Sequence, residues 1–222
     1  MRRLAVFASG NGTNFEAIAR ACRQGVLAAE VVLLVCDRPG ARVIGRAEEF
    51  GIPTFVFDPK AYGSKEEYER QIVQRLEEAG AELVCLAGYM RILGATMLGA
   101  CGGRIVNIHP SLLPAFRGKD AIGQAFDYGV KVFGVTIHWV DATLDGGRII
   151  AQRAFEYDGR DRAELEARVH AVEHELYVET LGRLIARAEE RGADTLPAEA
   201  ALPGGCTPYR GPSGTARNPG NK

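Results

Sequence analysis

The sequence lacks any long apolar run, which excludes a membrane-spanning helix, because such a helix needs roughly 20 consecutive apolar residues. The apolar stretch near the N-terminus, residues 4–8, is also too short for the core of a signal peptide. It is better interpreted as a first β-strand. We therefore expect no membrane partner.

Paired cysteines and an excess of charge of one sign are also missing. The five cysteines are Cys22, Cys36, Cys85, Cys101 and Cys206. They are odd in number and scattered, so they indicate neither a zinc site nor a disulfide framework, and they fit a reducing, cytoplasmic setting. The formal net charge of -1 gives no argument for a nucleic-acid partner.

What is present is an alternation of strand-like and helical patterns in 222 residues, enough to bury a core. Strands are predicted at residues 4–9, 30–37, 53–58, 81–88 and 103–108, and helices at residues 14–23, 42–50 and 64–80. The helix at 64–80 opens with a Ser64 cap and closes on Gly80. Repeated strand, helix, strand units predict an α/β fold with a single Rossmann-like, doubly wound, mostly parallel sheet.

The second half of the chain has a different pattern. Residues 134–141 and 148–157 are predicted to form two strands joined by a short turn, which gives the sheet an antiparallel extension. A long C-terminal helix is predicted over residues 162–191. Its apolar stripe consists of Leu165, Val169, Val172, Leu176 and Leu184. We expect one domain over residues 1–195, followed by a flexible tail, residues 196–222, that is rich in Gly and Pro.

Ligands of an open α/β sheet bind beyond the carboxyl ends of its strands. The first such place is the turn "SGNGTN", residues 9–14, where a helix follows at once. Gly10 and Gly12 permit a tight backbone turn, so free backbone N–H groups and the helix dipole would face an anion, most simply a phosphate. This is not the dinucleotide-binding fingerprint, because Phe15 stands where its third glycine would fall. An ordinary glycine-rich turn remains the alternative.

The second place is the turn after the fourth predicted strand, residues 87–93. The backbone turns at Gly88 and exposes the following residues at the edge of the sheet. This segment can line a flat apolar pocket, although a simple strand-to-helix connection explains these residues equally well.

The third place is the end of the fifth predicted strand, in the stretch "NIHPSLLP". Asn107 and His109 would share one face of a continuing strand, because side chains alternate with a period of two. An amide donor beside an imidazole can hold a developing oxyanion and move protons. A core histidine and a turn-capping asparagine are the alternative. Of the X-Pro bonds in this loop, Leu113–Pro114 is the main candidate for a cis peptide, but the sequence leaves its isomer open.

The fourth place is the turn "DATLDGG", which carries Asp141 and Asp145. A carboxylate near an imidazole orients the ring and stabilises its protonated form. Local sequence alone favours a plain hairpin turn.

The other histidines give weaker evidence of a functional role. His138 lies inside a predicted strand and is interpreted as structural. His170 and His174 have a spacing that can bind metal, but no third ligand is evident, so we expect no metal site.

These motifs together resemble the glycinamide ribonucleotide formyltransferase family of the formyl-folate transferase and hydrolase group. The resemblance spans residues 4–177 and includes "LAGYMRIL", "NIHPSLLPAFRG", "GVTIHWVD" with "LDGG", and "RVHAVEHELY". The "SGNGTN" start points to the ribonucleotide branch. The resemblance implies transfer of a formyl group from the cosubstrate 10-formyltetrahydrofolate to the amine of glycinamide ribonucleotide, in purine synthesis. It implies small-molecule substrates, no metal, and a monomer or homodimer.

The resemblance also implies roles for individual residues. It assigns a catalytic trio of Asn107, His109 and Asp145. It assigns the ribonucleotide and its phosphate to Gly12, Thr13, Asn14, His170 and Glu173. It assigns folate binding to Lys65, Met90, Arg91, Ile92, Leu93, Asn107, Asp141, Ala142, Thr143, Leu144 and Asp145. Residues 1–108 would form the phosphate-binding half of the domain, and residues 109–195 the folate-binding, closing half.

Three rival interpretations are weighed against this one. A formyltetrahydrofolate hydrolase normally has an extra domain before the catalytic one. A methionyl-tRNA formyltransferase has a basic domain after it. We expect neither protein, because a chain of this length has room for little beyond the catalytic domain. A non-catalytic nucleotide-binding module would use the glycine-rich turn, but it would not need Asn107, His109 and Asp145 to converge.

Overall fold

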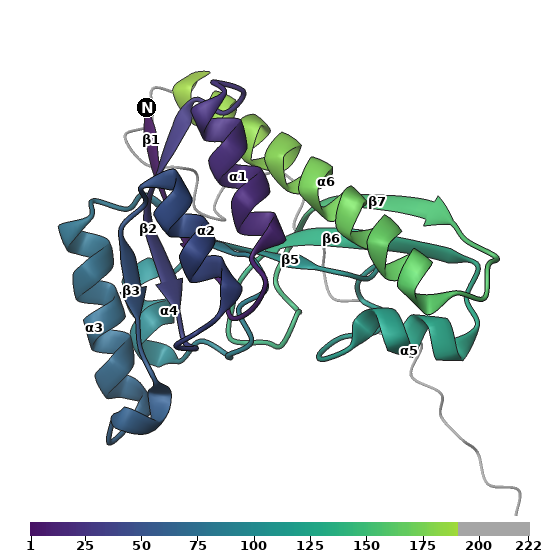
Figure 1. Cartoon of the computed structure of the whole chain (residues 1–222), viewed down its shortest axis with the longest axis horizontal. Coiled ribbons are helices and arrows are strands. Elements are labelled where there is room, and N and C mark those ends of the chain that lie inside the picture. The colour runs from purple at the N-terminus through teal and green to yellow at the C-terminus, as the bar shows by residue number, and fades with distance from the viewer. Residues whose placement is uncertain (191–222) are drawn as a thin grey trace, which may run out of the picture.

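The structure is a computed structural model that describes residues 1–190. The predicted tail, residues 196–222, lies outside the described residues, as does the end of the predicted domain. One seven-stranded sheet has the strand order β3-β2-β1-β4-β5-β6-β7 (Figure 1). Its strands are β1 (Arg2–Phe7), β2 (Ala29–Cys36), β3 (Thr54–Val56), β4 (Leu83–Leu86), β5 (Ile105–His109), β6 (Val132–Trp139) and β7 (Ile149–Glu156).

The strand directions confirm the predicted sheet. Strands β3, β2, β1, β4 and β5 form the parallel part of the sheet, in which each strand is parallel to the next. Strand β6 is antiparallel to β5, and β7 is antiparallel to β6. The sheet is therefore mostly parallel with an antiparallel extension.

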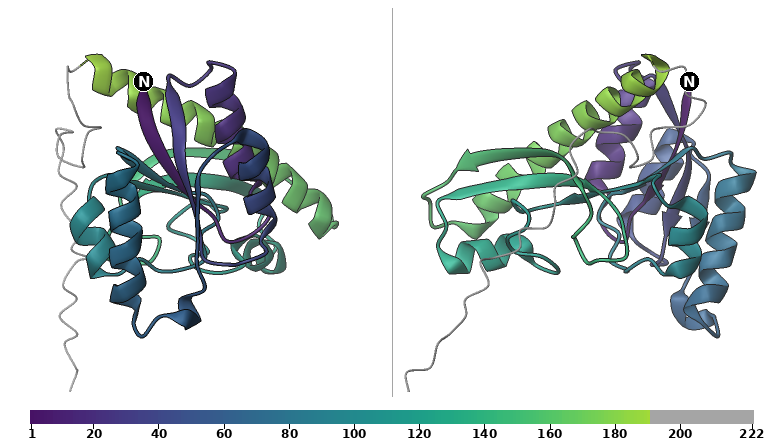
Figure 2. Two further views of the ribbon diagram at one scale, coloured as in Figure 1. Left: turned by 60° about the vertical axis from the view of Figure 1, so that its left-hand side comes forward. Right: turned by 180° about the vertical axis from the view of Figure 1, so that it is seen from behind.

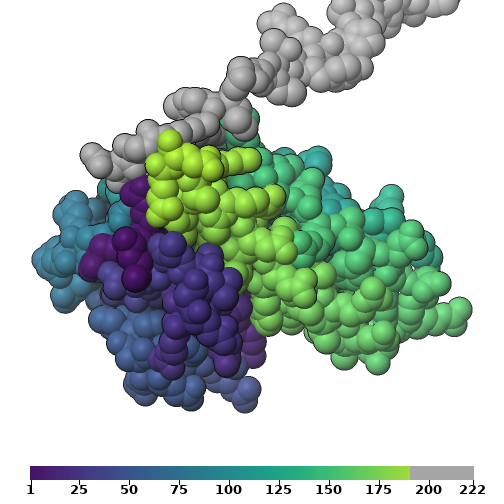
Figure 3. Space-filling model, turned by 90° about the horizontal axis from the view of Figure 1, so that it is seen from above, coloured from purple at the N-terminus to yellow at the C-terminus, as the bar shows by residue number. Residues whose placement is uncertain are grey.

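Helices cover both faces of the sheet, as a doubly wound fold requires (Figure 2). They are α1 (Thr13–Arg23), α2 (Arg42–Phe50), α3 (Lys65–Glu78), α4 (Ala95–Cys101), α5 (Ala121–Tyr128) and α6 (Arg162–Glu190), with a short 3-10 turn η1 (Pro59–Ala61). Helices α1, α2 and α6 pack on one face, and α3 and α4 on the other. Helix α6 lies along α1 at the surface seen in Figure 3.

Helices α4 and α5 are not among the predicted elements. Both are short, at seven and eight residues. Each contains a glycine, Gly99 or Gly123, which lowers helix propensity. Neither helix therefore has a clear local signal.

Strand β1 shows why its apolar run is continuous. Leu4 and Val6 pack into the core under α1 and α6, whereas Ala5 and Phe7 pack into the core under α3 and α4. All four side chains are fully buried. A strand covered on both faces has no position that favours a polar residue.

Two helices are held by polar contacts at specific points. The predicted cap of α3 is confirmed, because Ser64 Oγ accepts a hydrogen bond from the Glu67 backbone N–H at 3.2 Å. Helix α6 is anchored by Tyr177, whose hydroxyl lies 3.1 Å from the Leu86 carbonyl oxygen and 3.3 Å from that of Val106. This contact holds α6 against β4 and β5.

The loop after β5 is tied to the antiparallel strands. The Leu113–Pro114 bond, whose isomer the sequence leaves open, is cis. The Leu113 N–H donates to Thr136 Oγ1 on β6 at 3.0 Å, and Gln152 Nε2 on β7 donates to the Leu113 carbonyl at 2.9 Å. Within residues 1–190, none of the helices is long and apolar enough to cross a membrane.

Candidate active site

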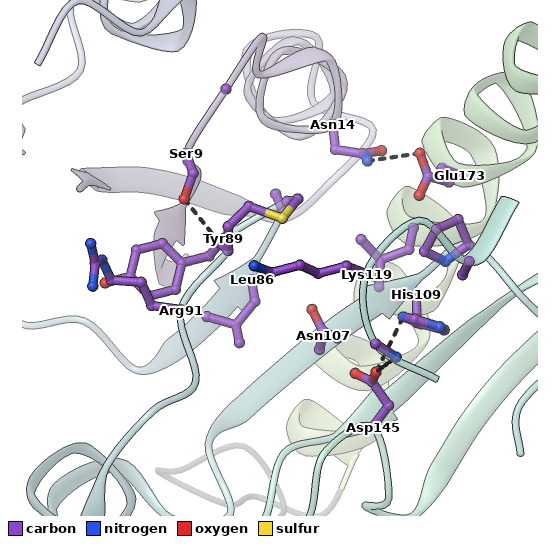
Figure 4. Close-up of a pocket in the computed structure, with 18 of the residues that line it drawn as sticks. Ser9, Asn14, Leu86, Tyr89, Arg91, Asn107, His109, Lys119, Asp145 and Glu173 are labelled. Atoms are coloured by element: carbon purple, nitrogen blue, oxygen red, sulfur yellow. Dashed lines mark hydrogen bonds and ion pairs between the residues drawn. The ribbon is translucent and has the colours of Figure 1, made fainter. Parts of the chain in front are cut away.

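A cavity of about 600 Å³ opens at the carboxyl ends of the parallel strands (Figure 4). This volume is typical of small-molecule sites. The walls come from the turn after β1, the turn after β4, the end of β5, the loop between β6 and β7, and helix α6. The four places that the sequence analysis selects therefore meet in one cavity.

The glycine-rich turn presents the N-terminus of α1 to this cavity. Gly12 has a φ of 77°, and a Cβ at this position would collide with the side chain of Val43. Only glycine therefore fits the turn. Thr13 and Asn14 are the first residues of α1, so their backbone N–H groups have no acceptor within the helix. The arrangement is suited to binding an anion.

Helix α6 contributes a polar wall opposite this turn. Glu173 is buried, and its Oε2 lies 3.2 Å from Asn14 Nδ2 and 2.8 Å from His170 Nδ1. The hydrogen bond with Glu173 raises the pKa of His170 above its ordinary value. Asn14 Oδ1 is buried and has no hydrogen-bond partner among the described residues. This wall is suited to a ligand that carries hydroxyl groups.

Asn107 and His109 both line the cavity from β5, as their spacing predicts. His109 Nε2 lies 2.9 Å from the Phe116 carbonyl oxygen, and because a carbonyl only accepts, this nitrogen carries a hydrogen. His109 Nδ1 lies 3.6 Å from Asp145 Oδ2, an ion-pair distance longer than a hydrogen bond. Both ring nitrogens thus face oxygen atoms, and the carboxylate can stabilise an imidazolium when one forms.

Asp145 is held in place by the loop that follows β5. The Gly118 N–H donates a hydrogen bond to Asp145 Oδ2 at 2.8 Å. Local sequence alone favours a hairpin turn around Asp145, but the tertiary structure brings its carboxylate to the imidazole of His109. The trio therefore converges from two strand ends.

His138 is a member of this cluster that the sequence analysis interprets only as structural. It lies on β6 directly opposite Asn107 in the strand register, and its Nε2 is 3.1 Å from Asn107 Nδ2. Its other nitrogen, Nδ1, donates to the Trp139 carbonyl oxygen at 2.8 Å. Burial lowers the pKa of His138, so the neutral ring accepts from the amide through Nε2. The sequence could indicate a role for His138 only if β5 and β6 were first paired in the correct register, which places His138 opposite Asn107.

The wall assigned to folate is apolar and partly exposed. Met90 and Ile92 project from the turn after β4 with 58% and 65% of their surface exposed, while Arg91 and Leu93 line the same edge. Leu144, in the loop between β6 and β7, lines the same cavity and is 52% exposed. The neighbouring residues Asp141, Ala142 and Thr143 also line it. Exposed apolar side chains from two different loops of one cavity are suited to a flat ring.

Lys65 is the one predicted folate-binding residue that the structure does not bring to the cavity. It lies at the start of α3, where its Nζ is 3.9 Å from Glu69 Oε1 in the next helical turn. The i,i+4 geometry of the helix directs it to this carboxylate.

Lys119 lines the cavity although it belongs to none of the four predicted places, and Ser9 lines it as a member of the glycine-rich turn that had no predicted role of its own. The Lys119 side chain extends towards the middle of the cavity in Figure 4. Ser9 lies behind the turn after β4, and its Oγ accepts from the Met90 N–H at 2.9 Å. An exposed lysine and a small serine carry no periodic signal.

Comparison with known proteins gives consistent matches. Residues 2–181 match the family model described as formyl transferase. The phosphoribosylglycinamide formyltransferase of Bacillus subtilis (strain 168) is 53% identical over 186 residues, which are 83% of this chain and 95% of that protein.

Solved structures agree with the sequence matches. Phosphoribosylglycinamide formyltransferase from Bacillus halodurans has a TM-score of 0.82 at 53% identity, covering 85% of this chain and 98% of that one. Glycinamide ribonucleotide transformylase 1 from Geobacillus kaustophilus has a TM-score of 0.81 at 56% identity, covering 83% and 98%. The chain therefore belongs to the formyl transferase family, in its phosphoribosylglycinamide formyltransferase branch.

Proposed function

We propose that this chain transfers the formyl group of 10-formyltetrahydrofolate to the primary amine of glycinamide ribonucleotide, in de novo purine (IMP) biosynthesis. The observation that carries the proposal is the convergence of Asn107, His109 and Asp145 in a cavity with one wall suited to phosphate and another suited to a flat ring. The relatives support it, because their names state both the acceptor and the group transferred.

The ribonucleotide lies along the wall formed by α1 and α6. Its phosphate accepts hydrogen bonds from the backbone of Gly12, Thr13 and Asn14, where the helix dipole also favours negative charge. Glu173 and His170 face the ribose and its hydroxyl groups. Two observations support this placement. Glu173 is buried, and its hydrogen bond to Asn14 joins α6 to the start of α1, so the residues proposed for the ribose lie next to those proposed for the phosphate.

The folate lies against the opposite wall. Its ring packs between the segment 90–93 and the loop 141–145, where Met90, Ile92 and Leu144 are exposed. This placement puts the formyl group near Asn107, in front of the trio. The reaction needs no metal, because the formyl donor is already activated.

The amine nitrogen attacks the formyl carbon, and the new C–N bond leaves a negative oxygen on a tetrahedral intermediate. Asn107 Nδ2 donates a hydrogen bond to that oxygen, and the His109 ring joins it once its Nε2–H leaves the Phe116 carbonyl, its hydrogen-bond partner in the structure. The bond from carbon to the folate nitrogen then breaks, and its electron pair stays on that nitrogen. His109 passes a proton from the attacking amine to the leaving nitrogen. Asp145 orients His109 and stabilises its charged form.

The domain organisation follows from this arrangement. We place the catalytic domain at residues 1–195, with a phosphate-binding half up to residue 108 and a folate-binding, closing half after it. Each half also contributes to binding the substrate assigned to the other half. Glu173, in the second half, lies beside the turn after β1, and the segment 90–93, in the first half, is proposed to face the folate. The cysteines of the described residues are all unpaired, which supports a reducing, cytoplasmic setting.

The decisive experiment measures loss of the formyl group from 10-formyltetrahydrofolate by purified protein, with and without glycinamide ribonucleotide. We expect deformylation that requires the ribonucleotide and yields the formylated amine. Deformylation without the ribonucleotide would identify a hydrolase instead. No deformylation under either condition would reduce the protein to a binding module and refute the proposal.

A further inference from the structure

The carboxyl ends of three neighbouring strands, β2, β1 and β4, are joined by one buried carboxylate. Asp37 follows β2, and only 3% of its side chain is exposed. Its Oδ1 accepts a hydrogen bond from Ser9 Oγ, after β1, at 2.5 Å. Its Oδ2 accepts from Arg91 Nε, after β4, at 2.8 Å. The two carboxylate oxygens therefore bind two different loops.

The contact through Ser9 has a defined direction. The Ser9 hydroxyl donates its only hydrogen to Asp37, so its lone pairs are left to accept, and the Met90 N–H occupies one of them at 2.9 Å. The Ser9 N–H also donates to the Gly88 carbonyl oxygen at 3.1 Å. Asp37 therefore fixes the hydroxyl orientation that joins the turn after β1 to the turn after β4.

These two turns are the ones assigned to different substrates. Ser9 begins the glycine-rich turn that leads to Gly12, and Arg91 lies in the segment 90–93 that we assign to folate; Figure 4 labels both residues. We propose that Asp37 is a positioning residue that holds the turn after β1, residues 9–14, and the segment 90–93 at a set separation. Binding of the ribonucleotide at the first then depends on binding of the folate at the second, and the reverse. This inference rests on the proposed function.

A purely stabilising role does not account for this arrangement. A buried ion pair adds little net stability, because the desolvation of both charges offsets their attraction. The Arg91 side chain is also not packed into the core, because 39% of it is exposed at the cavity wall. A carboxylate that binds both turns is best explained by the geometry it imposes on them.

The test measures cross-effects between the two turns. Ser9→Ala lies on the ribonucleotide side and should raise the KM for 10-formyltetrahydrofolate. Arg91→Lys lies on the folate side and should raise the KM for glycinamide ribonucleotide. Asp37→Asn should raise both KM values, each by about fivefold or more, the lower end of ordinary coupling between linked sites. Because the three residues act as one unit, Ser9→Ala combined with Asp37→Asn should be no worse than Asp37→Asn alone.

Glu82→Gln is the matched control. Glu82 forms an ion pair with Arg2 at 2.7 Å at the other end of β1, away from the cavity, so its loss should leave both KM values unchanged. If Asp37→Asn does not fold, Ser9→Ala and Arg91→Lys still decide the question. KM changes confined to each variant's own substrate, or a lower melting temperature with normal KM values, would overturn the inference.

The wild-type protein separates this inference from the proposed function. Ribonucleotide-dependent formyl transfer by the wild type, with no cross-effect in the variants, would reject the role of Asp37 alone. Absence of formyl transfer by the wild type would reject the proposed function, and this inference with it.

Discussion

Asn107 Nδ2 lies 3.1 Å from His138 Nε2, where the two residues pair across the antiparallel strands β5 and β6. The hydrogen bond from His138 Nδ1 to the Trp139 carbonyl leaves Nε2 as an acceptor while the ring is neutral. The Asn107 amide must therefore present its N–H side to the imidazole. Its second N–H is left to donate to a ligand in the cavity.

The first prediction concerns this pair. His138→Phe removes the acceptor and lets the Asn107 amide rotate, so kcat should fall by about tenfold or more, as expected for a lost hydrogen bond of this kind. Both KM values should change little. The control is His174→Phe, because His174 lies on α6 and does not line the cavity. A normal kcat for His138→Phe would show that Asn107 does not depend on His138.

The second prediction concerns the trio. His109→Ala and Asp145→Asn should each lower kcat strongly, because one lost oxyanion donor typically costs ~2.7–4 kcal/mol. Binding of the ribonucleotide, measured by calorimetry, should be nearly unchanged, since neither residue belongs to the wall formed by α1 and α6. Turnover close to the wild-type rate in either variant would remove that residue from the mechanism.

The third prediction concerns the glycine-rich turn, residues 9–14, where we place the phosphate. Gly12→Val places a side chain against Val43 in a backbone conformation that L-residues rarely adopt, so it should raise the KM for the ribonucleotide and destabilise the fold. Gly25→Ala is the control, because Gly25 also has a positive φ, of 73°, but no atom lies within 4 Å of its added Cβ. It should cost about 1 kcal/mol of stability and leave the KM unchanged. An unaltered KM in Gly12→Val would argue against the phosphate site.

The fourth prediction uses the pKa of His170, which its hydrogen bond with Glu173 raises. In the folded protein this histidine holds its proton at pH values where the unfolded chain has released it. The stabilisation is therefore complete below the unfolded pKa of about 6.5 and is lost as the pH rises through the folded pKa.

Glu173→Gln tests this linkage. In urea unfolding, the loss of stability should be larger near pH 6 than near pH 9, values chosen on either side of the ordinary histidine pKa of about 6.5. An NMR titration of the variant should show the pKa of His170 lowered towards its ordinary value. A pH-independent loss of stability would mean that the pair contributes no charge interaction.

The fifth prediction separates Lys65 from the folate site. Because Lys65 faces Glu69 on α3 and does not line the cavity, Lys65→Ala should leave the KM for 10-formyltetrahydrofolate within about twofold of wild type, as for a surface change far from contacts. Ile92→Ala, at the cavity wall, should raise the same KM. A large effect of Lys65→Ala would restore it as a folate contact.

Much of the fold follows from local patterns. The buried run in β1 and the Ser64 cap of α3 are properties of a few neighbouring residues, so they can be recognised without knowing the rest of the chain. The shared face of Asn107 and His109 is also local, because it depends only on the period of a strand. Helices α4 and α5 are not predicted, because short glycine-containing helices take their stability from packing rather than from propensity.

From the sequence one can read the order of the strands and of the longer helices, and the chemistry of the residues at the strand ends. Which of these residues meet becomes visible only in the folded chain. Asp145 lies beside His109, His138 pairs with Asn107, and Lys65 faces Glu69. These contacts depend on the sheet order and on the paths of the loops, because the packing of the whole chain sets both.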